Sequence, residues 1–158
     1  MFDDICDDPK KEEEWIALAR NNVEAYLADE KLKHGTIAGW PAWHIAPLTS
    51  IWAIESKIRP GWVGWWAIYG DHPTDYISAQ EIRHPRAAIR AFINQWTELA
   101  NCIQRGEKHP TIRLGNLSPS AELAELLVLR IQMLREMAVD DSLWDYAESQ
   151  FQTDSLEH

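Results

Sequence analysis

The chain has 158 residues, of which 46% are hydrophobic and 25% are charged, and this balance fits one soluble globular domain over residues 1–155. The formal net charge of −10 disfavours phosphate backbones and anionic lipid, so neither nucleic acid nor a membrane is expected as a partner. The two cysteines, Cys6 and Cys102, lie far apart, which excludes a disulfide framework and a zinc ribbon.

The two ends of the chain say little about function. Residues 1–8 form an acidic segment, and residues 156–158 resemble the remnant of an expression tag. The start lacks the basic and apolar regions of a signal peptide, and no apolar run reaches the ~20 residues that span a bilayer. A cytoplasmic location is therefore expected.

The first predicted element is a helix over residues 9–32. Pro9 suits the first helical turn, and His34-Gly35 is expected to end the helix. Apolar residues recur at spacings of three and four, which predicts one buried face. The residues of this face are Ile16, Ala19, Val23 and Leu27.

Two strands are predicted next, over residues 50–58 and 63–69, after an ordered loop at 35–49. Pro60 and Gly61 occupy the second and third positions of a type II turn between them, although the loop can be longer than this turn. The second strand is apolar on both faces, which predicts that the sheet is covered on both sides.

Three further helices are predicted, over residues 85–105, 119–138 and 143–151. Pro85 suits the first turn of one, and Ser118-Pro119 provides a cap and a first residue for the next. The apolar surface of helix 119–138 is broad. It is therefore either packed from two sides or shared with a second subunit.

Elements in this order indicate an α+β fold, namely a short antiparallel β-hairpin packed against three or four α-helices in one domain. A lone hairpin is marginal in water, so the helices are expected to cover it. Three arginines, Arg83, Arg86 and Arg90, are interpreted as a solvated helix face.

Asp71, His72, Asp75 and Tyr76 follow the second predicted strand and are weak candidates for catalysis. A carboxylate that orients an imidazole is the minimum unit of general base catalysis, and the same groups can bind a metal. The structural interpretation is favoured, because Gly-Asp and His-Pro are turn dipeptides and Asp or Thr caps short helical turns. No recognised metal-binding spacing is present, so neither a metal nor a cofactor is predicted.

Glu55 is a further weak catalytic candidate. A turn centred on residues 60 and 61 places Glu55 opposite Trp66 and residue 50 opposite residue 71. A carboxylate beside Trp66 would lose water, so its pKa is expected to rise.

Four tryptophans, Trp40, Trp43, Trp62 and Trp66, are weak candidates for a binding surface. The first three fall in predicted loops, where exposed aromatic side chains can anchor an interface. Equally, these three side chains can be buried and hold their loops against the hydrophobic core.

The string GWWAIYGDHPTDYI at 64–77, followed by HPRAAIRAFINQW, resembles a family of short bacterial proteins of unknown function. The resemblance implies a small cytoplasmic bacterial protein and no particular activity, cofactor or catalytic residue. The matching residues are Gly64, Trp65, Trp66, Gly70, Asp71, Pro73, Thr74, Asp75, Tyr76, Ile77, Pro85 and Arg86.

The leading functional prediction is a non-enzymatic domain that binds a protein partner or a small molecule. One alternative is a small hydrolase or metal-assisted enzyme that uses Asp71, His72 and Asp75. Another is a structural subunit that forms a homodimer through helix 119–138.

Overall fold

A computed structural model of the protein describes residues 8–115, 117–144 and 151–153, and the positions given below refer to these residues. The acidic segment apart from Asp8, and residues 156–158, lie outside them. The helices and strands are α2 (Pro9–Asp29), β1 (Trp43–Ile45), β2 (Thr49–Glu55), β3 (Val63–Gly70), β4 (His72–Ser78), α3 (Pro85–Gln104), α4 (Ala121–Val139) and the short 3-10 helix η1 (Asp141–Leu143).

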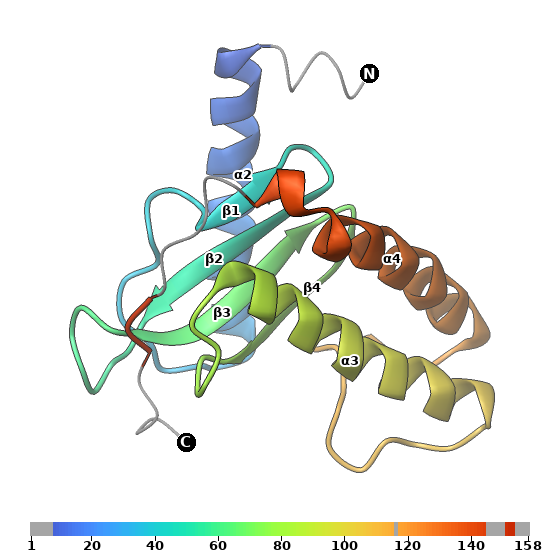
Figure 1. Ribbon diagram of the computed structural model, residues 1–158. Coiled ribbons are helices and arrows are strands. Elements are labelled where there is room, and N and C mark those ends of the chain that lie inside the picture. Colours follow the sequence, from blue (N-terminus) through green and yellow to red (C-terminus); the bar gives the residue numbers. More distant parts are fainter. Residues whose placement is uncertain (1–7, 116, 145–150, 154–158) are drawn as a thin grey trace.

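The four strands form one antiparallel sheet in the order β1-β2-β3-β4. Figure 1 shows α2 on one face of this sheet and α3 and α4 on the other, which confirms the α+β class. The prediction of a lone hairpin was wrong. Part of the predicted loop at 35–49 pairs as β1, and the predicted turn segment after residue 70 pairs as β4.

The loop between β2 and β3 contains the predicted type II turn, in which Trp62 N donates to Arg59 O at 3.1 Å and Gly61 has a φ of +86°. The loop spans residues 56–62, and a bulge interrupts the pairing beside Glu55. Because of both features, Ala53 rather than Glu55 lies opposite Trp66. The predicted register was therefore wrong.

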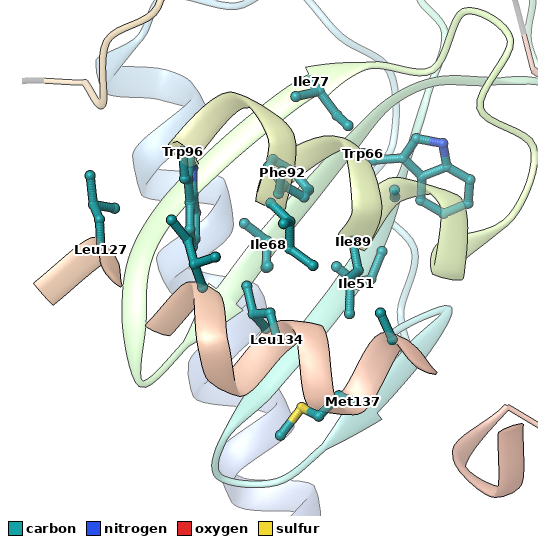
Figure 2. Packing of buried hydrophobic residues seen from close by; sticks show 14 of the residues in the cluster. Ile51, Trp66, Ile68, Ile77, Ile89, Phe92, Trp96, Leu127, Leu134 and Met137 are labelled. Atoms are coloured by element: carbon teal, nitrogen blue, oxygen red, sulfur yellow. The ribbon is translucent and has the colours of Figure 1, made fainter. Parts of the chain in front are cut away.

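Two cores lie on opposite faces of the sheet, as the doubly apolar β3 predicts. The core under α2 contains the predicted helix face together with Trp52, Ile54 and Ala67. The larger core lies under α3 and α4, and Figure 2 shows Ile68 of the sheet between Phe92 of α3 and Leu134 of α4. Residues of the sheet thus alternate between two separate apolar clusters.

The helix ends differ from the predicted ones. α2 stops at Asp29, because Lys31 has a positive φ of 57° and Leu32 N turns back to donate to Leu27 O. Ser120 caps α4 by accepting from Leu123 N, so the predicted cap at Ser118 was wrong. The helix predicted at 143–151 falls partly outside the described residues, which contain η1 at 141–143.

Arg86 does not lie on a solvated face. Its guanidinium donates to Ala138 O and to Asp141 Oδ1, each at 2.7 Å, and so ties α3 to the end of α4. None of the helices in the described residues combines the length and the apolar character that a membrane span requires.

Buried indole N–H groups need hydrogen-bond acceptors, and five of the nine tryptophans donate to acceptors inside the fold. The pairs are Trp43 with Leu143 O, Trp52 with Ser50 Oγ, Trp66 with Ile82 O, Trp96 with Asp75 Oδ2 and Trp144 with Met137 O. Of these five, Trp96 alone donates to an ionisable side chain.

Candidate functional site

The segment that carries most of the predicted site residues is an edge strand. β4 pairs with β3 through Ala67↔Tyr76 and Ile68↔Asp75, with an irregularity before Gly70↔His72. Proline lacks an N–H donor and is tolerated on edge strands, so Pro73 does not prevent pairing. The predicted helical turn capped by Thr74 or Asp75 is not formed.

Asp75 is the most buried carboxyl of the segment, with 6% of its surface exposed. Its Oδ2 accepts from Trp96 Nε1 at 2.9 Å, and its Oδ1 accepts from Tyr76 N at 2.8 Å. Burial raises the pKa of Asp75 to about 7, although both hydrogen bonds favour the charged form. Asp75 therefore changes charge near neutral pH.

His72 lies beside the same indole, with its ring centroid 5.5 Å from that of Trp96. Its Nδ1 lies 2.8 Å from Pro73 O, so Nδ1 carries the proton, and Nε2 accepts from the Thr49 hydroxyl at 2.9 Å. Burial lowers the pKa of His72 to about 4. The imidazole is therefore neutral at neutral pH.

Asp71 has different partners from this pair. It lies in the turn between β3 and β4, where its N–H donates to Leu48 O, and its exposed carboxylate is 3.5 Å from Arg130 Nη2. His72 and Asp75 thus meet at Trp96, whereas Asp71 does not join them. Among the described residues, no three His, Cys, Asp or Glu side chains are arranged to hold a metal ion.

Glu55 lies at the opposite end of β2 from Thr49 and His72. Its Oε1 accepts from Thr36 N at 3.0 Å, and its Oε2 accepts from Gly61 N at 2.8 Å. These hydrogen bonds hold the pKa of Glu55 below its usual range, opposite to the rise expected from a place beside Trp66. Glu55 thus joins the loop at Thr36 to the loop at Gly61, and it lies far from segment 71–76 along β2.

The four tryptophans proposed as binding anchors occupy different environments. Trp43 and Trp66 are fully buried in the larger core, so they offer no surface to a partner. Trp62 is half-buried under the Arg59 guanidinium, whose carbon lies 3.4 Å from the ring centroid. Trp40 is 50% exposed and packs edge-on against His44.

The surface of α4 carries the exposed apolar side chains Val128, Leu129 and Val139. The inward side of the helix packs against α3 and the sheet through residues such as Leu127, Ile131 and Leu134. The homodimer through helix 119–138 stays a prediction.

A cavity of about 360 Å³ lies against β4, and we call it the β4-edge cavity. It draws on the end of α2, on β4, on α3 and on the loop before α4. Its walls are Glu30, Asp75, Tyr76, Ile77, Ser78, Gln95, Thr111, Ile112 and Arg113. Of these nine residues, only the two isoleucines have side chains without a polar atom.

Tyr26 of α2 lies beside this cavity, with its ring centroid 6.2 Å from that of Tyr76. Its hydroxyl is buried and has no hydrogen-bond partner among the described residues. Burial and then the charge of Asp75 raise the pKa of Tyr26. Burial and then the charge of Glu30 do the same for Tyr76, so both phenols stay neutral at neutral pH.

Sequence reasoning found Asp75 and Tyr76 but missed Tyr26, Glu30, Gln95 and Arg113. One signal was present. Asp29-Glu30 places carboxylates at the C-terminal end of α2, where the helix dipole favours cations instead. A local rule broken in this way often marks a functional position.

A second cavity, of about 470 Å³, lies between the C-terminal end of α3 and the N-terminal end of α4. It is larger, and apolar side chains such as Leu99, Ile103 and Leu123 contribute much of its wall. It lacks the buried carboxyl and phenols, so the β4-edge cavity is the better candidate for specific chemistry.

A family model described as a domain of unknown function, DUF4826, matches residues 9–144. The match covers most of the chain, which therefore belongs to this family, and the predicted resemblance to a family of uncharacterised proteins is confirmed. Neither a curated protein nor a solved structure matches the chain.

Proposed function

We propose that this member of the family is a binding domain that takes up a small polar molecule in the β4-edge cavity without transforming it. The observation that carries this proposal is the buried carboxyl of Asp75 in the wall of a cavity with mostly polar walls. Titratable groups with displaced pKa values cluster at functional sites, and ligand sites are concave with a few polar groups that fix the orientation of the ligand. The volume of about 360 Å³ suits a molecule of metabolite size.

The buried hydroxyl of Tyr26 supports the same function. A buried hydroxyl without a partner costs about 1–3 kcal/mol, and proteins rarely keep such a group. The hydroxyl lies beside the cavity rather than in its wall, so a polar ligand would give it a partner, and recover part of that cost, after a rotation of the ring.

The hydrolase alternative has less support in the geometry. Asp71 lies near Arg130, His72 is held by Thr49 and by the Pro73 carbonyl, and Asp75 is held by Trp96. The three side chains thus have separate partners rather than converging on one reacting atom.

The indole N–H of Trp96 provides the test, because it donates to the Asp75 carboxyl in the cavity wall. A panel of amino acids, amines, hydroxy acids, dicarboxylic acids, sugars and nucleosides would be added to ¹⁵N-labelled protein. We expect at least one class to shift the Trp96 indole resonance in a saturable way.

Gln95→Phe is designed to fill the cavity, and Asn94→Phe is the matched control on the exposed face of the same helix. The shift should disappear in Gln95→Phe and persist in Asn94→Phe. A panel without any saturable shift of the Trp96 resonance would contradict the proposal, and so would a shift that survives in Gln95→Phe.

A further inference from the structure

We propose that the ligand of the β4-edge cavity is an amino-acid-like zwitterion, whose ammonium faces Glu30 and Asp75 and whose carboxylate pairs with Arg113. This inference rests on the proposed function, since it names the chemical class of the molecule that the cavity takes up. It follows from the distribution of charge around the cavity walls.

The cavity wall carries electronegative groups. Glu30 caps the C-terminal end of α2, where the helix dipole adds about half a negative charge to that of the carboxylate. Asp75 contributes a second, buried carboxyl. The phenol oxygens of Tyr26 and Tyr76 lie close enough to these groups to feel their charges. These groups favour a donor-rich cation such as an ammonium.

Arg113 supplies the opposite charge in the cavity wall. It belongs to the loop before α4 and is exposed, and its charge opposes that of the carboxyls at Tyr26 and at Tyr76. In the part of the chain that the structure describes, no salt bridge joins Arg113 to Glu30 or Asp75. The guanidinium can therefore donate two hydrogen bonds to a ligand carboxylate, in the bidentate geometry that arginine favours.

Ligands with a single kind of charge fit this pattern less well. An anion would meet Arg113 but would face both Glu30 and Asp75. A diamine would satisfy the carboxyls but would bring its second ammonium toward the guanidinium. A zwitterion places each charge beside a group of opposite sign.

The affinity for the zwitterion should also depend on pH, because Asp75 changes charge near neutral pH. A bound ammonium favours the ionised carboxylate, so affinity should increase as the pH rises through about 7. Burial keeps His72 and both phenols neutral in this range, and the charge of Glu30 also acts on Asp75, while the charge of Arg113 acts on the two phenols. A ligand bound through an anionic group alone would show the opposite trend.

A matched series of molecules tests the inference by calorimetry. The series comprises 4-aminobutanoate, n-butylamine and butanoate, which share one chain length, together with shorter and longer ω-amino acids and the α-amino acids. We expect a zwitterion to bind at least about ten times more tightly than the amine and the acid of equal length. Its affinity should rise about tenfold between about pH 6 and about pH 8.

Glu30→Gln and Arg113→Gln should each lower the affinity for that zwitterion about tenfold or more, since each removes one of the two charge contacts. The controls are Glu24→Gln on α2 and Arg105→Gln at the end of α3. Both residues are exposed and lie outside the cavity wall, so these variants should leave affinity unchanged. Circular dichroism would establish that all four variants are folded.

The results separate this inference from the proposed function. The assignment of a zwitterionic ligand is contradicted if n-butylamine or butanoate binds as tightly as the zwitterion. It is also contradicted if no member of the series binds while another polar molecule shifts the Trp96 resonance. In both cases the binding function survives. If neither the series nor the broader panel shifts that resonance, both proposals fail.

Discussion

Asp75 and His72 flank the same indole ring, that of Trp96, and burial displaces their pKa values in opposite directions. The pKa of Asp75 is raised to about 7 and that of His72 is lowered to about 4. In both cases burial penalises the charged form, and the neutral form is preferred. Two titratable groups at one site thus have opposite effects on stability as pH changes.

The free energy of unfolding should show these effects in two variants. Folded Asp75 binds its proton more tightly than the unfolded chain does, so its stabilising contribution is complete below about pH 4 and is lost as pH rises through about 7. Folded His72 binds its proton less tightly, so its contribution is present above about pH 6.5 and is lost as pH falls through about 4.

Asp75→Asn should therefore gain stability relative to the wild type as pH rises from about 4 to about 7, by up to ~4 kcal/mol at 1.36 kcal/mol per pKa unit. His72→Gln should gain relative stability as pH falls from about 6.5 to about 4. Urea unfolding at a series of pH values measures both changes. A difference between Asp75→Asn and the wild type that does not vary with pH would show that the pKa of Asp75 is not raised.

At the scale of elements, β4 was the main error of sequence reasoning. Pro73, Thr74 and Asp75 are typical of turns, and sequence alone does not show that a strand lies at the edge of a sheet. The pairing of β4 with β3 is a tertiary effect that overrides these local preferences. The α3 boundaries, by contrast, were close to those predicted, because Pro85, Gly106 and a long apolar stripe all indicate the same helix.

Gly70, at the end of β3, lies close against the backbone of Leu48 and Thr49, and this contact leads to a prediction. A Cβ at this position would overlap the Leu48 carbonyl oxygen and lie 2.6 Å from Thr49 Cα, both of which are backbone atoms. Gly70→Ala should cost ~3 kcal/mol or more, since the Leu48 carbonyl also accepts from Asp71 N. Thermal unfolding measures this loss.

The control for this prediction is Gly39→Ala. A Cβ at Gly39 would meet no atom within 4 Å, so the melting temperature should change little. A change in melting temperature as small for Gly70→Ala as for Gly39→Ala would show that the backbone at Leu48 can move aside.

At the scale of the whole molecule, the sheet separates two apolar cores, and the sequence predicts this arrangement well. The doubly apolar β3 and the amphipathic helices indicate it, because hydrophobic periodicity reports which faces are covered. The β4-edge cavity could not be predicted in the same way. Glu30, Asp75 and Arg113 come from segments far apart in the chain, and their meeting depends on how the elements pack.

Trp144, which follows η1, closes the larger core through stacked indoles. The rings of Trp43 and Trp144 lie 4.0 Å apart at 9°, and Trp43 also donates to Leu143 O. Trp144→Ala should cost ~3–5 kcal/mol, because it removes a buried aromatic side chain and leaves a cavity. Denaturant unfolding measures this cost.

Trp40→Ala is the comparison for this prediction. Trp40 is 50% exposed, so its removal should cost ~1 kcal/mol or less. A loss in Trp144→Ala as small as the one expected for Trp40→Ala would show that the Trp43–Trp144 stack contributes little to the stability of the fold.

The residues that made β4 resemble a loop also bear on the solubility of the protein. An edge strand presents backbone groups that another chain can pair with, and such edges promote aggregation. Pro73 offers no N–H donor on this edge, and Asp75 buries a carboxyl under Trp96, which an added strand from a second molecule would have to accommodate. The other edge, β1, is only three residues long. Among the described residues, the sheet thus ends in a three-residue strand on one side and in a strand that contains a proline on the other, and both features disfavour extension by another chain.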